Sequence, residues 1–393
     1  MVLNIPRPLS KVAGPREIVR QFVPSWFAVT MGTGILAVVI KDFPFQFPHQ
    51  DDLGWAYWFF NVGLFGIFSI LFLSRWIFFF NDAIPMFHHP VQSMFLGAIP
   101  MGLATIVNGL VLFGTPHWGN SATIAAIVLW FVDVGLAVLC GLLVPIFMLT
   151  THSHALESMS AVWLLPVVPG EVAAASGGLL LAVVQNQRLA QNIAFISMLL
   201  WGFSVPLSMS ILVIFFLRLV LHKLPPSDLI ISCLLPLGPI GTGALAATEL
   251  GLYAKRTFEN SGYGVSATTF QSLASATPAI AMFVATALWG YGVRWLVIAI
   301  FAIGHTLRNR LPFNLGWWGL IFPLGVFTAS TADLYKLTDF YLFRIPAAVF
   351  ICILFVLWWV VMFHTVVRAY SGELFYAPCL GPRQACTQNE LEI

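Results

Sequence analysis

The chain has 393 residues, of which 59% are apolar and only 9% are charged, and its formal net charge is +2. Soluble globular domains carry about 25% charged residues, so this composition excludes a soluble protein and predicts an integral membrane protein. A charge so close to neutrality excludes a polyanionic partner, and the sequence shows no basic patch suited to nucleic acid.

The first 22 residues are polar and basic, with Arg7, Lys11, Arg16 and Arg20. They have no apolar core of the kind that a cleavable signal peptide requires. We therefore expect a cytoplasmic N-terminal segment over residues 1–22, followed by an apolar stretch that inserts into the membrane and stays there.

Ten apolar stretches follow, and a spanning helix needs about 20 apolar residues. The predicted spans are residues 23–41, 57–80, 93–114, 122–150, 160–184, 193–217, 229–251, 276–304, 315–332 and 343–367. The ninth is the shortest. These spans make up a predicted transmembrane domain over residues 23–367, and residues 368–393 are expected to form a cytoplasmic tail.

The distribution of Lys and Arg indicates the orientation, because cytoplasmic loops carry an excess of them. Ten spans place both termini on one side, and that side holds eleven of the 18 Lys and Arg residues, among them Arg75, Arg218, Lys223, Arg308, Arg310 and Arg368. The opposite side holds six, and Arg294 falls inside the eighth span. This distribution predicts that both termini are cytoplasmic.

The odd-numbered spans share glycine and proline in their middles, written MGTG, GAIPMG, LLPVVPG, LPLGPIGTG and FPLG. Pro100, Pro166, Pro236 and Pro323 follow one another at intervals of 66, 70 and 87 residues, about one helical hairpin each. The even-numbered spans are smoother, with only Pro206 in an interior position. The pattern predicts five quasi-repeated hairpins in a ring, with broken helices around a central path and smooth helices facing lipid.

The breaks also indicate which residues line that path. Proline inside a helix frees a backbone carbonyl, and lipid tolerates freed polar groups only where they line a cavity or find a protein partner. Ordinary kinking is the alternative, since Pro and Gly are common in transmembrane helices. The predicted wall comprises Gly32, Thr33, Pro100, Thr105, Pro166, Pro169, Pro239, Thr242 and Pro323. Its hydroxyls would attract an anion without trapping it, although each is also a candidate interhelical contact.

Glu171, Arg294 and Asp133 are candidate functional residues, because each lies inside a predicted span, where charge is costly and indicates function. Glu171 in the fifth span would repel an anion unless it is protonated or paired, so it is a candidate for proton coupling or for a charge pair. Arg294 either binds the anion, pairs with Glu171 or extends to the membrane surface. Asp133 in the fourth span is either an interhelical hydrogen-bonding group or a proton relay.

At these same residues the sequence resembles the tellurite-resistance/dicarboxylate transporter family, which includes the fungal sulfite efflux pump, the fungal malate permease and the plant slow anion channels. The resemblance covers residues 18–367 and rests on six stretches in order. They are PSWFAVTMGTGIL, FLGAIPMGLATIVNG, LWFVDVGLAV, AVWLLPVVPGEVAAASGG, KLPPSDLIISCLLPLGPIGTG and GWWGLIFPLG. PMGLATIVNG, KLPP and GPIGTG look most like the sulfite pump branch.

The resemblance implies an all-α integral membrane protein of ten helices in five hairpins, with a central pore in each subunit of a homotrimer in the plasma (inner) membrane. It also implies a phenylalanine that closes the pore, and the matching position is Phe322, directly before Pro323. The alternative for Phe322 is core packing or contact with lipid. The implied function is transport of a small anion, with sulfite or bisulfite efflux first. The alternatives are a C4-dicarboxylate (malate) transporter and a passive anion channel.

The competing hypothesis is an integral-membrane enzyme, and the sequence contains little that would support catalysis. Asp51 and Asp52 are the only adjacent acidic pair, and no nucleophile–base set accompanies them. The histidines His88, His89, His152 and His154 are expected in solvated cytoplasmic loops. Cysteines fall in apolar stretches or, as with Cys379 and Cys386, in the tail without partners at metal-ligand spacing. We therefore expect no catalytic residue, no cofactor and no metal.

Overall fold

The computed structural model describes residues 8–259, 265–307 and 311–381. Arg7, Arg308, Arg310 and Cys386, which entered the sequence analysis, lie outside these ranges. Within them the chain is helical, and nine helical segments are long and apolar enough to cross a membrane. They are Pro24–Lys41, Gln50–Phe78, Ser93–Trp118, Asn120–Thr150, Gln187–His222, Ile230–Phe258, Ala267–Thr306, Leu315–Thr338 and Tyr341–Tyr370.

The fifth predicted span, residues 160–184, does not appear among these nine. It consists of a short 3-10 helix, η4 (Ala161–Leu164), a turn, and the 12-residue helix α9 (Pro169–Leu180). Every residue of α9 is buried. The eighth predicted span is also longer than expected, because α12 runs from Val265 to Thr306 and encloses Pro278.

Five units of the same form make up the inside of the molecule, each a 3-10 helix followed by an α-helix. The pairs are η1 (Pro24–Trp26) with α2 (Phe27–Lys41), η2 (Ser93–Gly97) with α6 (Ala98–Gly109), η4 with α9, η5 (Ile230–Leu234) with α11 (Leu237–Phe258), and η6 (Leu315–Leu320) with α13 (Ile321–Thr338). These are the odd-numbered spans of the sequence analysis. The expected interruption of each odd span is therefore a change from 3-10 to α-helix.

The prolines lie at that change and not in mid-helix as the sequence pattern suggested. Pro169 opens α9, Pro236 directly precedes α11, and Pro100 and Pro323 are each the third residue of their α-helix. Proline is tolerated there because amide groups in the first helical turn have no intrahelical acceptor. The rigid ring thus marks where each α-helix begins.

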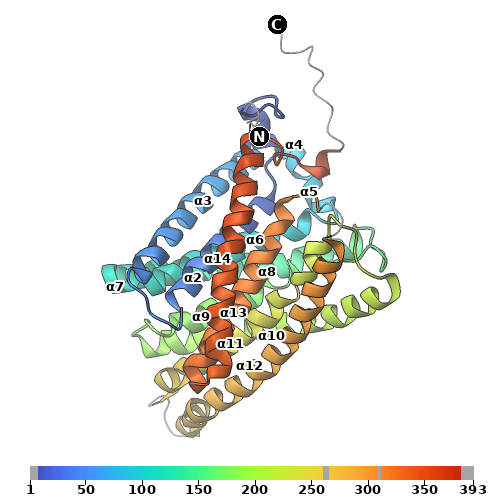
Figure 1. The fold of residues 1–393 in the computed structure, drawn as a ribbon. Coiled ribbons are helices and arrows are strands. Elements are labelled where there is room, and N and C mark those ends of the chain that lie inside the picture. Colours follow the sequence, from blue (N-terminus) through green and yellow to red (C-terminus); the bar gives the residue numbers. More distant parts are fainter. Residues whose placement is uncertain (1–7, 260–264, 308–310, 382–393) are drawn as a thin grey trace.

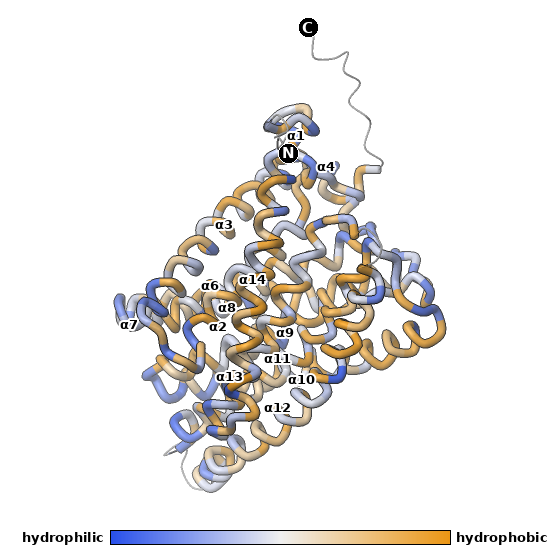
Figure 2. Tube along the Cα trace, in the orientation of Figure 1, coloured by the Kyte–Doolittle hydropathy of each residue, from blue (hydrophilic) through white to orange (hydrophobic). Residues whose placement is uncertain are grey.

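The intervening helices α3 (Gln50–Phe78), α8 (Asn120–Thr150), α10 (Gln187–His222), α12 and α14 (Tyr341–Tyr370) form the outside. In the segments that contain α2 and α11, 94% of the residues in the most apolar 18-residue stretch are buried. In the segments of α3 and α12 the corresponding share is only 22%. The tubes of these outer helices are largely orange, that is, apolar (Figure 2). A contiguous apolar surface of this extent suits contact with lipid.

Backbone contact between the inner units requires glycine. A Cβ atom at Gly97 of η2 would lie 2.0 Å from the carbonyl oxygen of Leu165, and one at Gly241 of α11 would lie 2.6 Å from the backbone nitrogen of Phe327. Real Cβ atoms do not approach so closely. Small residues at such interfaces allow helices in membranes to pack backbone against backbone.

Short helices connect or extend the long ones. They are α1 (Pro15–Arg20), α4 (Phe80–Ala83), α5 (Pro85–His88), the π-helix η3 (Leu110–Gly114), α7 (Thr115–Trp118) and η7 (Pro378–Leu380). The segment before α1 meets the end of α14 at one end of the bundle (Figure 1): the Leu9 amide donates to the Tyr370 carbonyl at 2.8 Å, and the Lys11 amide donates to the Ser371 carbonyl at 3.1 Å.

Candidate functional site

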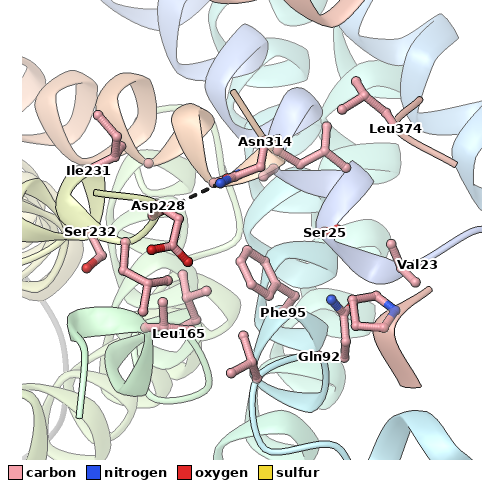
Figure 3. Close-up of a pocket in the computed structure, with 18 of the residues that line it drawn as sticks. Val23, Ser25, Gln92, Phe95, Leu165, Asp228, Ile231, Ser232, Asn314 and Leu374 are labelled. Atoms are coloured by element: carbon pink, nitrogen blue, oxygen red, sulfur yellow. Dashed lines mark hydrogen bonds between the residues drawn. The ribbon is translucent and has the colours of Figure 1, made fainter. Parts of the chain in front are cut away.

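A cavity of about 350 Å³, here called the vestibule, opens where the five 3-10 helices begin. Each of the five units contributes to its wall, through residues such as Ser25, Phe95, Val162, Ser232 and Gly316. Figure 3 shows these segments approaching the cavity from different sides. The N-terminal ends of the inner helices therefore converge on one space, and such ends carry partial positive charge that favours an anion.

Polar side chains in the wall of the vestibule include the acids Asp228 and Glu373. Asn314 donates from Nδ2 to the Asp228 carbonyl at 3.3 Å, and its Oδ1 accepts from the Gly316 amide at 2.8 Å, which caps η6. The buried Ser232 hydroxyl and the Gln92 Oε1 atom have no hydrogen-bond partner. The chain that follows α14 also contributes to the wall, including Leu374, Tyr376 and Pro378.

Beyond the vestibule the path narrows to a small cavity of about 10 Å³. Met31, Leu165 and Leu235 line both spaces, so the small cavity continues the vestibule into the bundle. Its wall also includes Met101, Phe322 and the predicted pore residues Pro239 and Pro323. Phe322 is 2% exposed. Such a volume is at the lower limit for one water molecule, so the path is closed here by apolar side chains.

Three predicted wall residues face other helices instead of these cavities. A Cβ atom at Gly32 would lie 2.6 Å from the Trp318 ring. Thr33 Oγ1 accepts from Trp358 Nε1 at 3.1 Å, and Thr105 Oγ1 accepts from Asn61 Nδ2 at 2.9 Å. Both hydroxyls thus make contacts with an outer helix, which was the alternative weighed for them. Pro100, Pro166 and Pro169 are buried and line neither cavity.

Glu171 lies between α9, α10 and α11 and is fully buried. Ser208 of α10 donates to its Oε1 at 3.3 Å, and Thr242 of α11, whose own hydroxyl donates to the Gly238 carbonyl, is a further neighbour. Its Oε2 atom has no donor. Glu171 therefore points into a polar contact between helices, outside the walls of the two cavities.

The structure does not bring Arg294 to Glu171. Arg294 is exposed on α12, and its guanidinium lies 5.4 Å from the centre of the Phe216 ring. Among the described residues no ion pair joins it to an acid. This favours the alternative that Arg294 extends along the outer surface. Asp133 is 1% exposed, and neither carboxylate oxygen has a hydrogen-bond partner, so the hydrogen bond expected of it is absent.

Sequence analysis missed a charged cluster at the opposite end of the inner helices. Lys336 Nζ lies 2.9 Å from Asp42 Oδ1 and 2.9 Å from Asp333 Oδ1. Glu249 of α11 interacts with Asp333 in the same cluster. The available signal was an interval of eleven residues: Asp42 follows Met31, Glu249 follows Gly238, and Asp333 follows Phe322 at this spacing. Eleven residues are about three helical turns, so each pair shares a helix face.

Of the four histidines expected in cytoplasmic loops, His88 ends α5, and His89, His152 and His154 lie in loops. His152 Nε2 is 2.7 Å from the Phe87 carbonyl oxygen, and the rings of His152 and His154 are 5.5 Å apart. Partial burial lowers the pKa of His89 and of His154, and the charge of neighbouring His152 lowers both further. These groups thus resist protonation in the folded protein.

Comparison with known proteins agrees with this architecture. The family described as SLAC1, voltage-dependent anion channel, matches residues 21–366. A sulfite efflux pump of Arthroderma benhamiae is 37% identical over 91% of this chain and 93% of its own length. An uncharacterized transporter of Methanocaldococcus jannaschii is 29% identical over 91% and 96% of the two chains. The malic acid transport protein of Schizosaccharomyces pombe is 22% identical over 89% and 79%.

These matches confirm the family resemblance that the six sequence stretches predicted. They also agree with the helical membrane architecture, in which a vestibule and a closed constriction are built from five similar units. The chain therefore belongs to the SLAC1 family of anion channels and transporters.

Proposed function

We propose that the chain exports sulfite or bisulfite across the membrane through the path that leads from the vestibule past Phe322. The observation that carries this proposal is the pair of cavities whose walls come from all five inner units. The sulfite efflux pumps at 37% identity favour this substrate. A C4-dicarboxylate such as malate is the alternative, supported by the malic acid transport protein at 22% identity. A passive channel for several anions is the third reading.

Phe322 acts in this proposal as the gate. Phe322 lines the small cavity together with Leu165 and Met101. No charged side chain lines that cavity, so an anion entering it loses water without a compensating charge. Movement of the ring would open a route between Pro239 and Pro323, where helix starts supply a favourable field.

Residues 161–180 serve in this proposal as the tenth crossing of the membrane. Nine crossings would place the two ends of the chain on opposite sides, yet Leu9 and Tyr370 are hydrogen-bonded to each other. The unit of η4 and α9 is shorter than the others, but its full burial spares it any contact with lipid. Residues 23–367 then form the transporter domain, between cytoplasmic segments 1–22 and 368–393.

The proposal also places the protein in the plasma (inner) membrane as a homotrimer, as the family resemblance implies. Excess Lys and Arg at the end that holds the termini supports their cytoplasmic location. Ion pairs connect segments at the end of the bundle where Leu9 meets Tyr370: Arg20 Nε lies 2.7 Å from Asp82 Oδ2, and Arg368 Nη1 lies 3.2 Å from Glu373 Oε1.

Flux from proteoliposomes of the purified protein tests the proposal, with sulfite and malate compared in the presence and absence of a pH gradient. Sulfite flux well above malate flux is expected. Malate flux without sulfite flux would promote the alternative, and no flux of any anion in wild type or in Phe322→Ala would refute transport. Glu171→Gln is measured alongside, because a role of Glu171 in proton coupling requires that this variant lose its response to the gradient.

A further inference from the structure

The charged cluster of Asp42, Glu249, Asp333 and Lys336, here called the outer cluster, lies on or directly after three inner helices that also line the small cavity. Three of its members follow residues of the small cavity by eleven positions, which places them about 16 Å further along on nearly the same helix faces. The helices concerned are α2, α11 and α13, all inner ones. On the proposed path, an anion that has passed Phe322 would then approach the outer cluster.

The outer cluster holds more negative than positive charge. Three carboxyl groups face the single ammonium group of Lys336, which contacts Asp42 and Asp333. Glu249 and Asp333 are 8% and 1% exposed, whereas the Lys336 side chain is 42% exposed. The buried carboxyls thus lie behind a residue that water reaches. Two ionised carboxylates in such a buried site repel each other and repel a passing anion.

The hydrogen bonds of the buried carboxyls are incomplete. Glu249 Oε2 has no donor although it is buried, and Asp333 is one of the charged groups around Glu249. Thr248 lies 3.3 Å from Asp333 Oδ2, but its single hydroxyl proton makes the shorter bond, 2.8 Å, to the Leu245 carbonyl. A buried acceptor without a donor is costly. One proton shared between Glu249 and Asp333 would supply the missing donor and remove one negative charge.

Among the described residues, two other cations at this end of the bundle have partners of their own. Lys41 is held by Asp51 at 2.8 Å, and the Arg344 guanidinium lies over the Phe45 ring at 4.4 Å. Tyr253 is the remaining titratable neighbour on α11. The α9 residue in contact with Glu249 is Gly178, which brings no charge. Within the described part of the chain, no three His, Cys, Asp or Glu side chains are arranged to hold a metal ion.

We propose that Glu249 and Asp333 form a proton-binding site at the outer end of the path, and that anions pass this end only while the proton is bound. The proposal rests on the proposed anion path and adds to it a regulation by the pH of the outer solution. Glu171 belongs to a different contact: it faces Ser208 of α10, whereas Lys336 of the outer cluster joins Asp42 and Asp333.

The experiment measures nitrate flux from proteoliposomes at equal pH on both sides, between about pH 5 and pH 8. Nitrate keeps its charge across this range, so a response to pH belongs to the protein, and equal pH removes the effect of mixed orientation. Wild-type flux is expected to fall as the pH rises, by up to about tenfold per pH unit once the site loses its proton. Glu249→Gln, which keeps the shape of a protonated acid, is expected to carry flux that is independent of pH.

Asp333→Asn gives a second test if Glu249→Gln does not fold, and Asp51→Asn is the matched control. Asp51 is an exposed carboxylate at the same end of the bundle, paired with Lys41 outside the outer cluster. Its variant is expected to keep the wild-type pH response. A pH response retained in both Glu249→Gln and Asp333→Asn overturns the proposal, as does one lost only in Glu171→Gln.

Infrared spectroscopy separates failure of this proposal from failure of the proposed function. A protonated carboxyl has a C=O stretching band distinct from that of a carboxylate, and the wild type is expected to show this band near neutral pH. The band should be weaker in Glu249→Gln than in wild type and unchanged in Asp51→Asn. If the band changes as expected and no anion flux is found, the proton-binding site is supported and the proposed transport function is refuted. An unchanged band overturns the proton site whatever the flux.

Discussion

Replacing Phe322 with alanine is expected to open the constriction. The small cavity holds about 10 Å³, and removal of the ring would free roughly 100 Å³, enough for about three water molecules. A hydrated constriction lowers the cost of stripping water from an anion, and each 1.4 kcal/mol removed from the barrier raises the rate about tenfold. We therefore expect flux in Phe322→Ala to exceed wild-type flux by at least about tenfold.

Phe327→Ala is the matched control for this variant. Phe327 lies on the same helix and is 0% exposed, but its ring stacks on Trp289 at 6.2 Å and lines neither cavity. Either substitution removes a buried phenylalanine, which costs about 3–5 kcal/mol in water-soluble cores. Both variants should therefore melt at lower temperature than wild type, and only Phe322→Ala should conduct faster.

The assay is stopped-flow anion flux from proteoliposomes, with protein content matched and melting temperatures measured in detergent. Equal flux in Phe322→Ala and wild type would refute the assignment of the constriction. A similar rise in Phe327→Ala would attribute the effect to loosened packing in general, which would refute the specific role of the Phe322 ring.

Three further predictions concern packing, the outer surface and pH. Gly97→Ala would place a Cβ atom 2.0 Å from the Leu165 carbonyl oxygen. We therefore expect the free energy of unfolding to fall by about 3 kcal/mol or more, with a clear drop in melting temperature. Gly66→Ala on α3, the control, meets open space and should melt like wild type. Arg294→Gln should change sulfite flux less than about twofold, because the side chain is exposed and away from both cavities; a large loss would show that it acts on the anion. Burial lowers the pKa of His154, so its contribution to stability is full above the unfolded pKa of about 6.5 and is lost as the pH falls below it. The hydrogen-exchange protection factors of loop 151–160, which correct for the intrinsic pH dependence of exchange, should therefore fall between about pH 8 and pH 5.5, and fall less in H154Q.

The sequence alone determined the class of protein and the plan of its helices. The low charge and the long apolar stretches predict a protein that is embedded in lipid. Nine of the ten predicted spans correspond to described helical segments long enough to cross a membrane. The regular spacing of Pro100, Pro166, Pro236 and Pro323 separated inner from outer helices. This worked because proline acts on the backbone locally, whatever the rest of the chain does.

The form of each interruption depended on more than proline. The spacing predicted mid-helix breaks, but the prolines are in or next to the first turn of α-helices that follow 3-10 helices. The short α9 was not predictable either, because its full burial between α8, α10 and α11 compensates for a length that would be insufficient against lipid.

Only the tertiary structure decided which polar side chains share a space. Thr33 sits beside a Gly-rich stretch in the sequence, yet the rotation of α2 turns its hydroxyl toward Trp358, 325 residues away. Asp42, Glu249 and Asp333 are unremarkable in sequence: Asp42 directly follows α2, and Glu249 and Asp333 are each the single acid of α11 and of α13. Their meeting depends on how three helices pack, and contacts between residues so distant in the chain are set by the whole bundle and not by any local pattern.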